Sequence, residues 1–517
     1  MKKYMILLLT AAFAFNACNF LEVPLESSVA TSNYFNNIEE FDMVLTGVYN
    51  AFKDTDTYDN RRYGNYFQGM MVITRVGTDE MIVKHDPGHG EYELSNYTYT
   101  ASNQTISRCW YTMYMVGQRA CVLIDRLAAS SLEDSEAKRR IEGEARFLRA
   151  FAYFHLVRLY GEVPIIDHEV SDISMVNLER RSIKDVYEFV LSDLTKAVDL
   201  IPEETEIGHI NKDAARAMLG TVYLQMAGKP LEDISKATLA KEMFAQVING
   251  GRHALVADWL GLFDGKHEHG PEYIWDIEFV NLGSTGYGGQ VGTMDGISTP
   301  FSGYWSRCQT SREFYESFDP NDLRRDAIAR YSYVENEDKE LVKEYYEDYD
   351  TEFDSHFYAY KFRHGLTQAE RGAGWANWSN PINSPIIRYA DVLLMYAEAD
   401  MRANGQAGSD ALEYVNQVRR RGFGVDVHTP DIKVDLKSLT YENLLAERSF
   451  ELCFEGHRWY DLVRFGELGN AIRKYHYNSS LEHIDPSVFN EKHLFYPVPQ
   501  DVIDASNGAI QQNRGWL

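Results

Sequence analysis

Apolar residues recur at steps of three and four along most of this chain, and this period constrains the fold more than any other feature of the sequence. Residues spaced in this way lie on one face of an α-helix, where they can be buried together. The pattern predicts helices at about 36–52, 105–128, 136–160, 182–200, 211–227, 236–249, 390–401, 411–418 and 440–466. A chain of 517 residues with this many helical stripes is expected to be mainly α.

Several of the expected helices come in pairs whose inner faces alternate small and large residues. Ala214, Ala217 and Tyr223 in one helix are followed by Ala240 and Phe244 in the next. Small residues opposite large ones let two helices pack closely, as in tetratricopeptide-like hairpins, although the spacing here is irregular. We therefore expect degenerate helical hairpins.

Residues 252–385 have a different character. Trp275 and Ile277 alternate with Asp276 and Glu278, which is the period of a half-buried strand. Much of the remainder is rich in glycine, tyrosine and acidic residues and has no helical period. The stretch is predicted to form an irregular, loop-rich lobe with a few short strands.

These patterns divide the body of the chain into three expected regions. The first is a helical region at 36–251, which contains a loop insertion at 54–104 rich in Tyr, Gly and Asp. The irregular lobe at 252–385 follows. The third region, 386–517, is helical and ends in a tail that is expected to wrap the surface. A chain of this length usually needs more than one core.

The N-terminus has the features of a bacterial lipoprotein signal. The apolar run Met5–Phe15 is shorter than the roughly 20 residues that span a bilayer, but it suits a signal peptide. Ala17 and Cys18 follow directly and resemble a lipobox. We expect residues 1–17 to be removed, Cys18 to carry lipid, and residues 18–35 to form a tether. The alternative is an ordinary secretory signal with an incidental cysteine.

Charge and cysteine content exclude several classes of protein. The chain has 51 basic and 77 acidic residues, a net charge of −26, so a nucleic acid partner would be repelled. Cys109 and Cys121 share one expected helix, about 18 Å apart, too far for a disulfide. Cys308 and Cys453 are isolated, so we expect buried cysteines and no disulfide or zinc framework.

No enzyme motif stands out. His267 and His269 are two residues apart, so they would diverge on a helix and do not form a zinc-binding pair. Asp54, Asp56 and Asp59 could meet a calcium ion, but a tyrosine occupies a ligand position of the calcium-loop pattern. We therefore predict no catalytic residue, no metal and no cofactor.

Several motifs spread over the chain resemble the SusD/RagB family of binding lipoproteins. They are Cys18–Leu21, Gly143–Pro164, Pro385–Ala399, Glu447–Leu462 and Tyr496–Gln500. The resemblance implies a right-handed scaffold of tetratricopeptide-like helical hairpins in a Bacteroidota-type bacterium. It also implies a non-enzymatic protein, anchored in the outer membrane by lipid and facing the exterior. Such a protein docks on a SusC-like TonB-dependent transporter and delivers an oligosaccharide or peptide for import.

In the family motif Glu447–Leu462, charged residues recur at steps of three and four. Arg448, Glu451, Glu455 and Arg458 can pair along a helix or bind neighbouring backbone. Acid/base chemistry is the alternative, but an adjacent arginine lowers the pKa of a carboxyl group and makes it a poor general acid. We therefore expect these residues to be structural.

The expected ligand site lies where the 54–104 loops meet the irregular lobe. Aromatic rings can stack on sugar rings, and polar side chains can bind the hydroxyls. The candidate ligand-binding residues are Tyr97, Tyr99, Asn103, Tyr304, Trp305, Trp375, Trp378, Arg75 and Asp79. For each aromatic residue the alternative is local packing.

The sequence leaves three other functions open. A surface glycoside hydrolase would need two carboxyl groups about 5 Å or 7–9 Å apart in an aromatic cleft. A peptide-binding RagB-like protein would share the fold but not the ligand. A pure scaffold would show an extended groove or a flat face.

Overall fold

The computed structural model describes residues 34–53, 66–84, 87–172, 178–279, 292, 295–297, 306–346, 356–362, 382–475 and 488–516. Several residues singled out by the sequence lie outside these ranges: Cys18, Asp54, Asp56, Asp59, Tyr304, Trp305, Trp375 and Trp378. The expected signal peptide and nearly all of the expected tether lie outside them as well.

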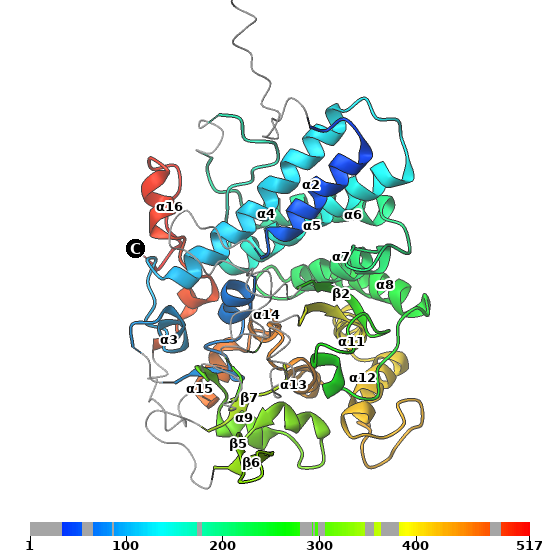
Figure 1. Ribbon diagram of the computed structural model, residues 1–517, viewed down its shortest axis with the longest axis vertical. Coiled ribbons are helices and arrows are strands. Elements are labelled where there is room, and N and C mark those ends of the chain that lie inside the picture. The colour runs from blue at the N-terminus through cyan, green and yellow to red at the C-terminus, as the bar shows by residue number, and fades with distance from the viewer. Residues whose placement is uncertain are drawn as a thin grey trace, which may run out of the picture.

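A layer of long helices forms one end of the molecule, the upper part of Figure 1. Its members are α2 (Ile38–Asn50), α4 (Gln104–Ala129), α5 (Glu136–Tyr160), α6 (Ile183–Leu200), α7 (Lys212–Ala227) and α8 (Lys236–Asn249). Polar caps start several of them, because a side-chain oxygen can accept from the unpaired amides of the first turn. Asn37 accepts from the amide of Glu40 at 2.9 Å, and Ser135 accepts from that of Lys138 at 3.2 Å.

The pairs α5–α6 and α7–α8 pack as the alternation of small and large residues predicts. A Cβ atom at Gly220 would lie 2.8 Å from the Phe244 ring, and one at Gly143 would lie 2.7 Å from Ile201. Ala214 and Ala240 are fully buried. Close approach of neighbouring helices therefore depends on these small residues, and the hairpins are consistent with a tetratricopeptide-like array.

The C-terminal helices continue this array and then turn toward the middle of the molecule. They are α11 (Tyr389–Asn404), α12 (Ser409–Gly422), α13 (Tyr441–Leu452), α14 (Arg458–Phe465), α15 (Leu468–Tyr475) and the short α16 (Gln500–Ala505). Helix α11 packs against α8 and α12. The chain is thus mainly α, as predicted.

One predicted helix is two. The period suggested a single helical segment at about 440–466, but α13 ends at Leu452 and α14 begins at Arg458. Gly456 in the turn has a φ of +85°, and a Cβ there would lie 2.9 Å from both the Met71 sulfur and the Thr74 hydroxyl. The break lets the Met71 and Thr74 side chains pack directly on the turn, which the local sequence period cannot show.

Short strands and single turns of helix make up the irregular lobe. β1 (Ile82–Val83), β3 (Cys308–Gln309), β7 (Tyr358–Ala359) and β4 (Ile328–Ala329) form a sheet in that order. β2 (Tyr273–Ile277) pairs with β8 (Ser384–Arg388), and β5 (Tyr331–Glu335) pairs with β6 (Leu341–Tyr345). Short helices also occur: η4 (Phe67–Met71), α3 (Gly90–Ser95), η6 (Leu260–Phe263), α9 (Arg312–Ser317), η7 (Leu323–Ala327) and η9 (Glu491–Leu494).

The structure changes character near the expected limits of the lobe, since α8 ends at Asn249 and α11 begins at Tyr389. Most strands lie between these helices, but β1 belongs to the 54–104 insertion. A division of the chain at 251/252 and 385/386 stays a prediction.

Buried ion pairs hold the middle of the molecule together. We call Glu272, Arg324, Lys361, Arg388, Arg421, Glu451 and Glu455 the central charge network; all of them are buried. Arg388 is its hub, because Nη1 lies 2.6 Å from Glu272 and 3.0 Å from Glu451, and Nη2 lies 2.6 Å from Glu455. Lys361 reaches Glu455 at 2.5 Å and Arg421 reaches Glu451 at 2.7 Å.

The charged residues of the motif make structural contacts, as expected, and Arg458 binds neighbouring backbone at the Leu445 carbonyl, but most of the ion pairs do not run along one helix. Glu451 and Glu455 bind Arg388 from β8, and Arg458 binds Asp79 at 2.5 Å, so the pairs cross between elements. Burial by itself would raise the pKa of Glu451, but Arg421, Arg388 and Arg324 lower it to about 2. Such a carboxylate stays charged and holds elements together.

Candidate functional site

Two regions far apart in sequence, the 54–104 insertion and the irregular lobe, meet through backbone pairing. β1 pairs with β3, with Ile82 opposite Gln309 and Val83 opposite Cys308. The pairing continues when the Lys84 amide donates to the Arg307 carbonyl at 3.0 Å. The predicted meeting of the two regions is therefore present, and we call this place the loop junction. It comprises residues 75–84, 295–297, 306–309 and the hairpin β5–β6.

The short segment 295–297 connects the parts of the loop junction. Asp295 accepts from Arg75 Nη1 at 2.6 Å, which ties the segment to the insertion. The Gly296 carbonyl accepts from the Ser306 hydroxyl at 2.8 Å. Ile297 packs with Tyr358 and Tyr360, against which Tyr331, Tyr333 and Tyr346 also lie. One segment thus links the insertion, the start of β3 and the β5–β6 hairpin.

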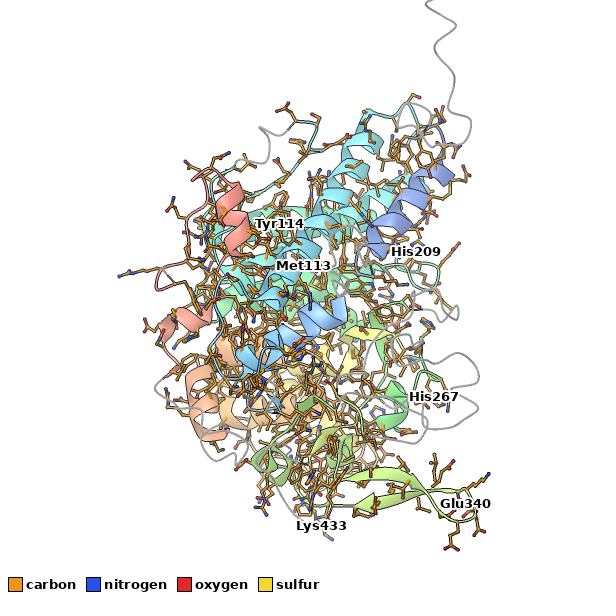
Figure 2. The ribbon with its side chains drawn as sticks, turned by 60° about the vertical axis from the view of Figure 1, so that its left-hand side comes forward. Met113, Tyr114, His209, His267, Glu340 and Lys433 are labelled. Carbon is orange, nitrogen blue, oxygen red and sulfur yellow. The ribbon has the colours of Figure 1, made fainter. Side chains whose placement is uncertain are left out.

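The β5–β6 hairpin carries tyrosines on one face. Tyr331 lies directly opposite Tyr345, and Tyr333 lies opposite Lys343, so the four side chains share a face. The Tyr331 ring lies 5.5 Å from that of Tyr333 and 5.4 Å from that of Tyr345. Tyr345 is 63% exposed. Figure 2 shows the hairpin projecting from the body, with Glu340 near its tip. Such a face can stack on a flat apolar ligand surface.

This tyrosine face was missed in the sequence, although a signal for it exists. Tyr331 and Tyr333 alternate with Ser332 and Val334, which is a strand period. The turn that follows is closed when the Asn336 amide donates to the Glu340 carbonyl at 2.9 Å. The acidic residues that surround the hairpin in sequence concealed the alternation.

Tyr97 and Tyr99, two predicted ligand residues, lie in the core. They are 4% and 3% exposed, and burial raises the pKa of both phenols well above the usual range. The Tyr97 hydroxyl donates to the Gly77 carbonyl, and the Tyr99 ring lies 5.1 Å from Trp516 and 5.4 Å from Tyr496. These rings offer no open face here, and packing is the role that their contacts show.

Asn103, Arg75 and Asp79 are likewise committed to internal contacts. The Asn103 side chain caps α4 by accepting from the amides of Thr105 and Ile106 at 3.0 and 3.2 Å. Arg75 donates from Nε to the Met71 carbonyl at 2.7 Å and pairs with Asp295, and Asp79 pairs with Arg458. All three are buried.

Four aromatic candidates of the lobe lie outside the described residues, so their role stays a prediction. They are Tyr304, Trp305, Trp375 and Trp378. Trp305 directly precedes Ser306, whose position at the loop junction is fixed by its bond to Gly296.

One carboxyl group near the loop junction has an unusual pKa. Glu80 is 1% exposed and accepts hydrogen bonds from the Phe454 amide at 3.2 Å and the Ser449 hydroxyl at 3.3 Å. Burial raises its pKa to about 8 although Arg458 opposes the shift. A proton donor of this kind suits a general acid, but no substrate can reach a group so deeply buried.

A cavity of about 820 Å³ lies between α9, α13, α14 and α15. Aromatic side chains line it, with cationic side chains among them: Phe314, Phe450, Tyr441, Phe465, Arg402 and Lys474. Its volume is within the range of ligand pockets, which is about 300–1,000 Å³.

Known protein families share the sequence features of this chain. The model of the SusD family matches residues 249–516, which is more than half of the chain. A second family model, described as starch-binding and associating with the outer membrane, matches residues 19–224. A SusD-like protein, P2, from Formosa agariphila is 28% identical over 494 residues, covering 91% of this chain and 92% of its own.

Solved structures have the same fold. A SusD homolog from Bacteroides thetaiotaomicron superposes with a TM-score of 0.80 at 25% identity, covering 95% of this chain and 100% of its own. Surface glycan-binding protein A from the same species, in complex with laminarihexaose, superposes with a TM-score of 0.72 at 20% identity, covering 92% and 99%. From the family match, the fold and the motifs together, the chain belongs to the SusD family.

Proposed function

We propose that this protein binds a glycan at the loop junction and presents it for import across the outer membrane. The observation that carries the proposal is the tyrosine face of β5–β6, where Tyr345 is exposed and Tyr331 and Tyr333 are partly buried beside it, in a chain of the SusD family. Sugar rings stack on aromatic faces, and Tyr345 presents most of its side chain to solvent. A neighbour of the same fold is described in complex with laminarihexaose.

The proposal extends to an anchor and a partner. Cys18 would carry the lipid, and a SusC-like TonB-dependent transporter would receive the ligand. In the part of the chain that the structure describes, no helix combines the length and apolar character needed to cross a membrane. One of the matching family models is described as associating with the outer membrane, which supports a lipid anchor at Cys18.

Binding without chemistry fits the loop junction better than glycoside hydrolysis. A hydrolase needs one carboxylate and one carboxylic acid that both face the substrate. At the junction, Asp295 and Asp79 are paired with arginines and Glu80 is buried, and the exposed carboxylates Glu335, Glu340 and Glu344 lie on the projecting hairpin. We therefore propose that the ligand leaves unaltered, and the release of reducing ends from a bound oligosaccharide would contradict this.

The test is a glycan array on the purified protein, followed by calorimetry with the best ligand. Replacing Tyr345 with Ala removes an exposed stacking ring and is expected to weaken binding by about 1–3 kcal/mol, as the loss of a base-stacking ring does. Val342→Ala is the matched control, because Val342 is 38% exposed on the opposite face of the same hairpin. Equal affinities for both variants and the wild type would contradict the placement.

Trp305→Ala tests the predicted part of the same site. We expect weaker glycan binding with an unchanged melting temperature and an intact complex with the transporter. A lower melting temperature together with lost binding would instead identify Trp305 as a packing residue.

A second candidate function is peptide binding, and the 820 Å³ cavity favours it. Its aromatic rings suit a peptide with apolar side chains, and its lining carries both cationic and acidic residues. Phe450→Ala should then abolish binding of such peptides and leave glycan binding unchanged. If the wild-type protein binds glycans but no peptide, this candidate function is excluded.

A further inference from the structure

A turn and a strand end bring three metal-ligating side chains together. His269 lies in the turn after η6, and Asp276 and Glu278 lie at the end of β2. Ligand atoms of the three side chains all lie within 4.8 Å of one another. Asp276 and Glu278 are two residues apart, so a strand places both carboxylates on the same side.

The Asn383 amide holds the carboxylates in place. Its Nδ2 donates to Asp276 Oδ2 and to Glu278 Oε2, both at 3.0 Å, which uses its two protons. Its Oδ1 accepts from the Phe279 amide at 2.8 Å, and its own backbone amide donates to Glu268 at 2.6 Å. All hydrogen-bonding groups of the Asn383 side chain are thus used to orient the cluster.

One oxygen of the cluster is left without a hydrogen bond. Glu278 Oε1 is shielded from solvent, although 34% of the side chain is exposed, and it accepts from no donor among the described residues. It lies 3.5 Å from His269 Nδ1. Two ligands of a tetrahedral zinc ion, at about 2.0–2.2 Å from the metal, lie about 3.3 Å apart. The two atoms are therefore placed as ligands of one ion would be, whereas they form no hydrogen bond with each other.

The charge of the cluster also favours a cation. Three carboxyl groups gather around Asn383, since Asp276 and Glu278 accept from its side-chain amide and Glu268 accepts from its backbone amide. Lys53 shares the adjoining cleft of about 200 Å³, where its ammonium lies 5.4 Å from the centroid of the Phe279 ring and interacts with the Glu278 charge. The cleft reaches Asp276 and Glu278 and gives an ion a way in.

We propose that His269, Asp276 and Glu278 bind a divalent transition-metal ion of the Zn²⁺ class. An imidazole nitrogen with two carboxylates suits such ions, whereas Ca²⁺ and Mg²⁺ prefer oxygen ligands alone. The ion would join the turn at 264–270 to the end of β2, and Asn383 would act as the outer partner that orients the carboxylates.

The test is calorimetric titration of Zn²⁺ into the full-length chain, purified in detergent and treated with chelator. We expect one equivalent to bind, and His269→Ala to weaken binding by more than about a hundredfold, beyond the roughly 10- to 100-fold that follows loss of an outer partner. His267→Ala is the matched control, because His267 is a neighbouring exposed histidine that faces only Asp264, at 3.0 Å. Figure 2 labels His267 on this turn.

Several outcomes overturn the proposal. The absence of saturable Zn²⁺ binding would contradict it. An equal loss of Zn²⁺ affinity in His269→Ala and His267→Ala would also contradict it, because it would indicate adventitious binding to surface histidines. Displacement of Zn²⁺ by an equal concentration of Ca²⁺ would show that the class of metal is wrong.

A spectroscopic variant keeps the test independent of folding. Glu278→Gln preserves the acceptor for Asn383 but removes the carboxylate, so we expect the visible absorption of bound Co²⁺ to disappear while the melting temperature of the metal-free protein stays unchanged. A Co²⁺ spectrum identical to that of the wild type would exclude Glu278 as a ligand.

Discussion

The helices α5–α8 and the central charge network are both buried, but different interactions hold them together. In α5–α8, small residues such as Gly220 lie against rings such as Phe244, and the partners come from adjacent elements. In the charge network, Arg388 binds Glu272 and Glu451, which are 116 and 63 residues away. Apolar packing tolerates a change at one position better than a network in which each charge neutralises several others.

Breaking the hub should have the largest effect. Arg388→Ala leaves Glu272, Glu451 and Glu455 with too few cations in a buried place, and breaking a buried pair costs about 3–5 kcal/mol. We expect the free energy of unfolding, measured with urea, to fall by that amount. Arg139→Ala, which removes an exposed pair with Asp134, should leave the urea midpoint unchanged. Equal effects of the two variants would show that the network contributes no more than a surface pair.

Acid should weaken the network before it affects the helices. The folded-state pKa of Glu451 is lowered to about 2 from an ordinary value of 4.5. Its contribution is therefore fully present above about pH 4.5 and is lost as the pH falls toward 2, about 3 kcal/mol in all. Unfolding free energies measured across this window should fall less steeply for Glu451→Gln than for the wild type. Parallel curves would contradict the assigned charge state.

Overpacking a helix pair should have a smaller effect. Gly220→Ala places a methyl group about 2.8 Å from the Phe244 ring, and we expect a loss of about 1–3 kcal/mol in the free energy of unfolding. Gly47→Ala in α2 is the control, because its Cβ would meet nothing within 4 Å. Alanine is a better helix former than glycine, so the free energy of unfolding of the Gly47→Ala control should rise by up to about 1 kcal/mol. If both variants raise, or both lower, the free energy of unfolding, the close packing of Gly220 against Phe244 is contradicted.

The smallest effect is expected at the edge of the loop junction. Asn103→Ala removes the cap of α4 and should cost about 1 kcal/mol of stability. Asn103→Ser keeps a capping oxygen and places no new charge beside Glu93, to which the Asn103 amide donates at 2.7 Å, so it should retain part of the stability. Because Asn103 is buried, we expect both variants to bind glycan as the wild type does. A loss of glycan affinity in Asn103→Ser at unchanged stability would give Asn103 the ligand role that the sequence suggested.

Much of the fold could be predicted from the sequence, whereas the site could be predicted only in part. Helices such as α5 and α7 follow from local apolar period, and the cap at Asn37 follows from residue type. The meeting of the 54–104 insertion with the lobe was also predicted, and β1–β3 pairing confirms it. The break at Gly456 was not predicted, because it depends on contacts with Met71 and Thr74, which belong to a distant segment of the chain.

By itself the sequence determined the helical class, the hairpins and the family, because these depend on spacing along the chain and on motifs of adjacent residues. The tertiary structure decided which tyrosines are core and which are exposed, since Tyr97 and Tyr345 are chemically the same residue. It also decided which charges meet. Burial and ion pairing depend on what packs against a side chain from elsewhere in the chain, and on distances of a few ångströms that no local pattern fixes.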